Sequence, residues 1–214
     1  MPTIPHMHSY EPSQGHGLAH DPFNAIVAPR PIGWISTRDA DGQLNLAPYS
    51  FFNAFLYTPP IVGFSSVGWK DSVRNAEATR EFVWNLVTRD LDTRMNVTSA
   101  PLAPGESEFA AAGLTPVESK IVGVPRVGEA RAAMECKVVD VIQHKSAAGV
   151  PADGWLVLGE VVAVHIDETL IVDGVYQTAL ARPILRAGRA GDYFEVSEGA
   201  MFEMERPKGA PRPA

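Results

Sequence analysis

The sequence contains almost no cysteine. Cys136 is the only one in 214 residues, so no disulfide can form within the chain and no cluster of cysteine ligands can hold a metal. It lies in the apolar run MECKVV, where a small buried side chain is expected rather than a reactive thiol. These observations exclude a disulfide scaffold and a cysteine-based metal site.

Long hydrophobic runs are also absent. No stretch approaches the roughly 20 apolar residues that a membrane-spanning helix needs, and the start of the chain, MPTIPHMHSYEPSQGHG, lacks the basic and apolar blocks of a signal peptide. Positive charge is scarce, because 18 Lys and Arg stand against 25 Asp and Glu. An acidic chain disfavours nucleic-acid and anionic membrane partners. We therefore expect a soluble cytoplasmic protein with no nucleic-acid and no membrane partner.

The motifs of common hydrolases and zinc enzymes are missing. The sequence has no GxSxG and no HExxH. The stretch QGHGLA (14–19) lacks the third glycine of a dinucleotide loop, and GWKDS (68–72) lacks the upstream glycine of a P-loop. The spacing of the N-terminal histidines fits no dedicated metal site, so no metal is predicted at His6, His8, His16 and His20.

Composition divides the chain into three parts. Residues 1–20 are rich in His, Pro, Gly and Ser and are predicted to form an arm or tail, while residues 201–214 end in PKGAPRPA and are predicted as a second tail. Residues 21–200 are predicted to form a single domain. A chain of this length buries about 70% of the surface that its unfolded state exposes.

Strand-like segments dominate this domain. The stretch PIGWISTRDADGQLNLA predicts two strands joined at Asp41-Gly42. Further strands are predicted at 60–67, 81–87, 134–144 and 154–166. Short helices are predicted at 70–79, 89–100 and 106–113. Seven or so strands without a steady β-α alternation predict a mainly β, barrel-like fold with short peripheral helices.

Three polar stretches carry the functional signal. PRPIGWIST (29–37) ends in hydroxyls, NLAPYSFFN (45–53) combines a proline with three aromatic rings, and FSSVGWKDS (64–72) gathers hydroxyls and a lysine where a helix should begin. Pro48 fixes its own φ and removes a donor, so 45–53 is predicted as a stiff turn. A helix N-terminus with hydroxyls and a lysine suits a phosphate, and a rigid aromatic loop suits a flat heterocycle. The pattern indicates a mononucleotide such as FMN; the alternative is that the hydroxyls form turns and the rings belong to the core.

These stretches in this order, followed by EFVWNLV (81–87), resemble the flavin reductase-like family with its FMN-binding split barrel. The resemblance runs from roughly Asp21 to Glu195. It implies a homodimeric split β-barrel with FMN sites near the interface. It also implies hydride transfer from NADH or NADPH to a flavin, which such reductases often supply to a partner monooxygenase.

The resemblance also implies a set of site residues. His165 matches a histidine near the flavin and nicotinamide in some members, and is the catalytic candidate. The flavin-binding candidates, which include two residues of the C-terminal motif RAGRAGDYF (186–194), are Ser36, Thr37, Ala47, Tyr49, Ser50, Phe51, Phe52, Asn53, Lys70, Asp71, Ser72, Arg189 and Tyr193. Pro48 is expected to stiffen the turn so that its N–H groups stay aimed at the flavin ring.

Three alternatives to a reductase stay open. One is a non-catalytic FMN electron carrier of the flavoredoxin kind, reduced by a protein partner. Another is an oxidase related to the pyridoxamine phosphate oxidases, although the sequence has no second Arg-rich cluster for a substrate phosphate. The last is an FMN-binding protein that acts in assembly or regulation. No ribose-reading Asp or Arg is identified, so NADH and NADPH remain alternative donors.

Overall fold

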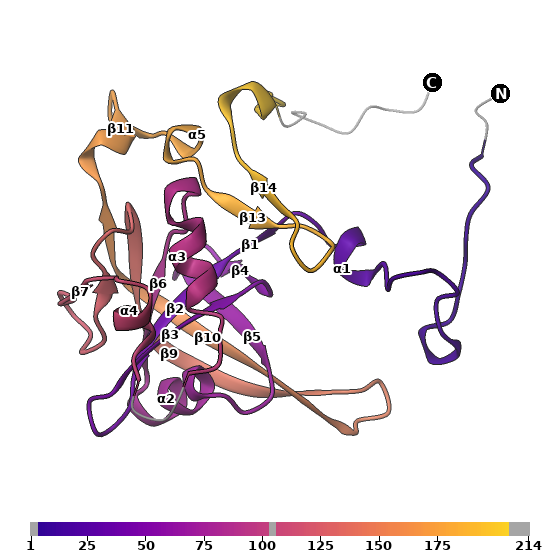
Figure 1. The fold of residues 1–214 in the computed structure, drawn as a ribbon, viewed down its shortest axis with the longest axis horizontal. Coiled ribbons are helices and arrows are strands. Elements are labelled where there is room, and N and C mark those ends of the chain that lie inside the picture. Colours follow the sequence, from indigo (N-terminus) through magenta and orange to yellow (C-terminus); the bar gives the residue numbers. More distant parts are fainter. Residues whose placement is uncertain (1–3, 103–105, 206–214) are drawn as a thin grey trace.

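The computed structural model describes residues 4–102 and 106–205. Its centre is one antiparallel sheet of seven strands in the spatial order β3-β2-β6-β9-β10-β5-β4 (Figure 1). The strands are β2 (Gly33–Arg38), β3 (Leu44–Tyr49), β4 (Phe52–Leu56), β5 (Ile61–Val67), β6 (Glu81–Asn85), β9 (Ala132–Lys145) and β10 (Pro151–Ile166). The mainly β fold is therefore confirmed, and β9 and β10 form a hairpin that projects beyond the rest of the sheet.

The sheet rolls up because its two edge strands are consecutive in the chain. β3 and β4 lie at opposite edges, yet only Ser50 and Phe51 separate them. The three Cα steps from Tyr49 to Phe52 span at most about 11 Å, whereas six strand spacings in a flat sheet cover about 29 Å. A bond from Ser65 N–H to the Phe51 carbonyl at 2.8 Å continues the pairing of β4 and β5 into this connection. The curled sheet is the predicted split barrel.

Pro48 lies inside a strand, contrary to the prediction of a turn that covers 45–53. It pairs with Trp34 in the register of β3 and β2. β3 has a neighbour on one side only, and an edge strand tolerates proline because one row of its N–H groups needs no partner. The turn itself consists of Ser50 and Phe51 alone.

Aromatic rings fill the barrel. Phe64 and Phe82 are fully buried and meet edge to face, with ring centroids 5.5 Å apart. Gly159 of β10 makes room for them, because a Cβ at this position would lie 2.4 Å from Cε1 of Phe82. Helix α2 (Asp71–Thr79) closes one end of the barrel with the buried side chains of Val73 and Ala76.

The other helices are short and peripheral, as predicted. The predicted helix at 89–100 is η2 (Arg89–Leu91) followed by α3 (Asp92–Val97), and that at 106–113 is α4 (Glu108–Ala111). A small sheet in the order β1-β13-β14 lies beside the barrel. The remaining elements are η1 (Pro12–Gln14), α1 (Phe23–Ile26), β1 (Arg30–Pro31), β7 (Pro116–Val117), β8 (Arg126–Val127), η3 (Glu168–Leu170), β11 (Ile171–Val172), β12 (Val175–Tyr176), α5 (Thr178–Ala181), β13 (Ile184–Arg186), β14 (Tyr193–Glu195) and η4 (Glu198–Ala200).

The N-terminal segment 4–22 runs away from the barrel (Figure 1) and has no buried residue. Its residues contact one another, as in the bond between His8 Nε2 and the backbone carbonyl of His16 at 2.8 Å. Within 4–102 and 106–205, no group of three or more metal-binding side chains is found, and no helix is long and apolar enough to cross a membrane. Residues 1–3 and 206–214 of the predicted arm and tail lie outside the described residues.

Candidate functional site

The turn between β3 and β4 presents polar groups that have no partner. Phe51 is 43% exposed, and Asn53 is exposed beside it. The Asn53 carbonyl oxygen accepts from Ala54 N–H at 2.8 Å, and its amide nitrogen, like the hydroxyl of half-buried Ser50, has no hydrogen bond within the described chain. A ring and free donors on a short turn and the strand that follows it suit the edge of a flat heterocycle.

β5 leads from the neighbourhood of this turn to the beginning of α2. Ser65 bonds to Phe51 through its backbone, and its hydroxyl lies 2.9 Å from Nε2 of His144. Lys70 follows five residues later as the exposed N-cap of α2, and it takes part in none of the ion pairs of the described residues. Asp71 instead pairs with Arg74 at 2.8 Å. A free ammonium at a helix N-terminus is a suitable place for a phosphate.

Several predicted site residues are buried beneath this region, and their hydrogen bonds hold α2 against the barrel. The Asn45 amide donates to Ser72 Oγ at 2.8 Å and to Thr37 Oγ1 at 3.3 Å. Burial raises the pKa of the Tyr49 hydroxyl, although its hydrogen bonds with Ser72 and Ser66 oppose the shift. The phenol is therefore neutral at pH 7, and these side chains join α2 to the barrel.

Ser36 has no exposed surface either. Its hydroxyl donates to the Pro125 carbonyl at 2.7 Å and lies 3.3 Å from the Asn85 amide. Phe52 stacks on Trp84 with ring centroids 5.7 Å apart, and half-buried Ala47 packs against the barrel core. The side chains of these predicted site residues pack within the barrel, and their contact with a ligand stays a prediction: Ser36, Thr37, Ala47, Tyr49, Phe52 and Ser72.

Two arginines beside the turn were missed by the sequence analysis. Arg30 is 7% exposed, donates to the carbonyls of Asn24, Val27 and Ala187, and has its guanidinium carbon 5.6 Å from the centroid of Phe51. Arg186 lies opposite Arg30 in the register of β1 and β13. Burial and the charge of Arg186 lower the pKa of Arg30, and neither arginine forms an ion pair within the described residues. Their signals were the arginines of PRPIGWIST and PILRAG.

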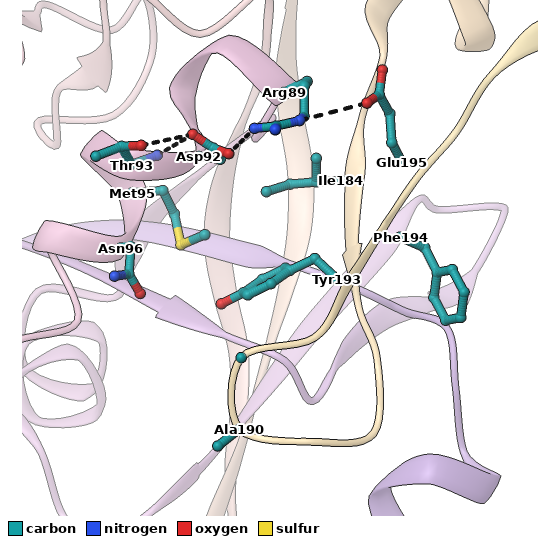
Figure 2. A pocket seen from close by; sticks show the side chains of 11 residues that line it. Arg89, Asp92, Thr93, Met95, Asn96, Ile184, Ala190, Tyr193, Phe194 and Glu195 are labelled. Atoms are coloured by element: carbon teal, nitrogen blue, oxygen red, sulfur yellow. Dashed lines mark hydrogen bonds and ion pairs between the residues drawn. The ribbon is translucent and has the colours of Figure 1, made fainter.

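Tyr193 lines a cavity of about 580 Å³ between α3 and β14. Figure 2 shows its ring lying across the cavity, with the hydroxyl directed toward Asn96 and with Met95 and Ile184 nearby. The Arg186 guanidinium lies 4.7 Å from the same ring and holds it in place. Arg189 does not line this cavity; it is 70% exposed and pairs with Asp192 at 3.3 Å.

His165 lies in a different cavity, of about 530 Å³, at the far end of β10. Across the sheet, His165 pairs with Ala133, Ala133 with Asn85, Asn85 with Trp34 and Trp34 with Pro48. Four strand spacings, about 19 Å, therefore separate His165 from Pro48, and His165 does not contact the Ser50–Phe51 turn of the same chain.

A buried carboxylate fixes the His165 ring. Nε2 lies 2.6 Å from Oε1 of Glu135, which also accepts the backbone N–H groups of Lys120, Ile121 and Val122 at 2.6 to 3.0 Å. Burial raises the pKa of the Glu135 carboxyl, but hydrogen bonds from His165 and these N–H groups outweigh it and bring the pKa to about 2. Because an ionised carboxylate only accepts, Nε2 carries a proton and Nδ1 is the ring nitrogen left for other contacts.

Comparison with known proteins gives a consistent result. The model of the flavin reductase like domain matches residues 27–180. An uncharacterized protein of Halalkalibacterium halodurans is 39% identical over 187 residues, which are 85% of this chain and 87% of that protein. Nitrilotriacetate monooxygenase component B from Bacillus cereus is 33% identical, covers 94% of this chain and 100% of its own, and superposes with a TM-score of 0.83. The flavoredoxin of Desulfovibrio vulgaris (Miyazaki F) shares the fold at 24% identity, with a TM-score of 0.73 over 84% of this chain and 91% of its own.

Proposed function

Because the chain belongs to the flavin reductase-like family, we propose that it is an FMN-binding, NAD(P)H-dependent flavin reductase. The observation that carries the proposal is the set of unpartnered groups on one short path, from the Ser50–Phe51 turn and Asn53 to Lys70. FMN, when bound, supplies the hydride-accepting chemistry that NADH or NADPH requires. The protein has to bind and orient the reactants and balance their charge.

Each exposed residue has a separate role in the proposal. Ser50 and Asn53 donate to the ring edge of the flavin, and Phe51 packs against it. Lys70 and the first N–H groups of α2 bind its phosphate. Arg30 and Arg186 place positive charge beside the turn, where it stabilises an anionic ligand. Thr37, Tyr49 and Ser72 keep α2 and the turn in register with each other.

A catalytic role for His165 is proposed with a second copy of the chain, because within one copy four strand spacings, about 19 Å, separate it from Pro48 beside the turn. The edge strand β4 and the residue after it carry exposed apolar side chains, with Phe55 at 53%, Leu56 at 50% and Tyr57 at 92%. An exposed apolar edge strand favours pairing with another chain. We therefore include a homodimer in the proposal, with His165 of one copy near the flavin of the other.

A partner protein is the other part of the proposal. The likeness to a monooxygenase component B supports the delivery of reduced flavin to an oxygenase. The shared fold with a flavoredoxin keeps an electron carrier as the second candidate. The two differ in one property: a carrier binds FMN tightly but is not reduced directly by a nicotinamide nucleotide.

The test is an anaerobic visible spectrum of the purified protein with FMN, recorded before and after NADH and then NADPH. Bleaching within seconds by either nucleotide supports the reductase and identifies the donor. Bound flavin that stays oxidised with both nucleotides favours the carrier. A spectrum identical to that of free FMN, with no bound fraction after gel filtration, contradicts both.

A further inference from the structure

The cavity that contains His165 also contains an arginine, Arg126, to which the proposed flavin site assigns no role. Its walls come from β8, from residues 128–131 and from the end of β10. Besides His165, its charged lining residues are Arg126, Glu129, Arg131 and Asp167. We call it the Arg126 cavity.

Arg126 has no partner for its side chain within the described residues. It forms no hydrogen bond and no ion pair there, and its Nε is buried without an acceptor. A guanidinium has five N–H donors and no acceptor, and a buried donor without a partner carries a desolvation penalty. The arrangement is therefore stabilised by any ligand that brings oxyanion acceptors.

Both carboxylates of the lining are already occupied. Glu129 accepts from Arg94 at 2.9 Å and from the hydroxyl and N–H of Thr115, each at 3.1 Å. Asp167 accepts from Arg131 at 2.9 Å and from the N–H and hydroxyl of Thr169. The carboxylates of the cavity therefore already accept hydrogen bonds, whereas the donors of Arg126 are unpaired within the described residues. This holds although the two arginines and the two carboxylates balance in formal charge.

His165 complements Arg126 in this respect. Its Nε2 is bound to Glu135, so Nδ1 is its only ring nitrogen that can contact a ligand. Nδ1 accepts from a P–OH group when the ring is neutral and donates to a phosphoryl oxygen when the ring is protonated. Arg126 supplies the forked donors that match phosphoryl oxygens.

We propose that the Arg126 cavity binds a phosphoryl group, held by Arg126 and oriented by His165, at a site that does not include the Ser50–Phe51 turn of the same copy. Two sources have this chemistry. One is the nicotinamide nucleotide of the proposed reductase, in which case the inference rests on that proposed function. The other is a different phosphorylated small molecule.

The test is calorimetric titration of the full chain, loaded with FMN where it binds, with inorganic pyrophosphate. The expected result is saturable binding by the wild type that weakens at least tenfold in Arg126→Gln. Arg38→Gln is the matched control, because Arg38 also has a buried, unpartnered Nε and lies outside the cavity; its affinity should equal that of the wild type. Arg126→Lys keeps the positive charge but loses the forked pair of donors, so its affinity for pyrophosphate should lie between those of the wild type and Arg126→Gln. It replaces Arg126→Gln in the test if that variant does not fold.

No binding by the wild type, or equal binding by all variants, overturns the proposal; the second result means an adventitious ion only. A repeat with saturating NADPH identifies the source. Displacement of pyrophosphate assigns the phosphoryl group to the nucleotide donor, and undiminished binding assigns it to another phosphorylated molecule. The titration requires neither flavin nor turnover. Its result can therefore be interpreted even if the visible spectrum shows no bound FMN.

Discussion

Glu135 shows how one buried charge can fix the position of another side chain, that of His165. Its carboxylate is fully buried and accepts three backbone N–H groups in addition to His165. In Glu135→Gln, the amide NH2 replaces an acceptor and meets donors that have no other partner. We expect the free energy of unfolding at pH 7, measured by urea denaturation, to fall by about 2–4 kcal/mol.

The same residue predicts a pH dependence of stability. The pKa of Glu135 is about 2 in the folded protein, against an ordinary value of 4.5. The folded state therefore binds this proton more weakly than the unfolded state, so the stabilisation is fully present above pH 4.5 and is lost as the pH falls toward 2. The difference corresponds to about 3 kcal/mol.

Denaturation of the wild type and of Glu135→Gln between pH 7 and pH 3 checks this prediction. The stability of the wild type should fall more steeply, so that the two curves converge at low pH. Parallel curves would show that Glu135 does not titrate with a lowered pKa.

Ser50 provides the residue-level test of the proposal that flavin binds at the Ser50–Phe51 turn. It is half-buried, and its hydroxyl has no partner within the described chain. An indole at this position should block access to the turn without disturbing the core, so Ser50→Trp should weaken FMN binding at least tenfold while the melting temperature stays within a few degrees. Flavin fluorescence quenching measures the affinity, and Ser146→Trp, on the exposed β9–β10 connection, is the control. Equal affinity in both variants would remove the turn from the site.

At the scale of an element, β10 depends on a close approach that only glycine permits. A Cβ at Gly159 would lie 2.4 Å and 2.7 Å from two carbons of the Phe82 ring. Gly159→Val should therefore displace Phe82 and lower the free energy of unfolding by about 1–3 kcal/mol. Gly199→Val is the control, because a Cβ at that position meets no atom within 4 Å. A thermal denaturation in which both variants match the wild type would mean that the barrel core adapts without cost.

Elements with a local signal were predicted well. The hairpin of β2 and β3 followed from Asp41-Gly42, and Gly42 has the positive φ of 87° that such a turn favours. Pro48 led to a wrong boundary, because its compatibility with a strand depends on whether that strand lies at an edge. Strand order is a property of the whole sheet, and the local residues do not encode it.

At the scale of the whole molecule, the residues of the candidate site also divide into those that are close in the sequence and those that only folding brings together. Ser50, Phe51 and Asn53 lie close together in the sequence, so a local pattern was enough to predict them as site residues. The pairing of Arg30 with Arg186 and of Glu135 with His165 joins distant parts of the chain, and no spacing rule predicts it. Ser36 and Thr37 match the family motif equally well, yet only the packing of the barrel reveals that they are buried.

The exposure of the N-terminal arm predicts that the stability of the barrel does not depend on it. Residues 4–20 are not buried, and their aromatic contacts join Tyr10 to His8 and His16 within the arm itself. Attachment to the barrel begins later, where Arg30 donates to the carbonyls of Asn24 and Val27. Deletion of residues 1–20 should therefore leave the free energy of unfolding unchanged within about 0.5 kcal/mol, as measured by chemical denaturation.

A longer deletion is the informative control. Removal of residues 1–28 also takes away α1 and two acceptors of the buried Arg30 guanidinium, so it should cost about 1–3 kcal/mol. If the shorter deletion is also destabilising, and more so at high protein concentration, then the arm packs against a second copy of the chain. In that case the exposed Ile4, Met7 and Leu18 are its contacts, because apolar side chains on an extended arm gain stability only where another surface covers them.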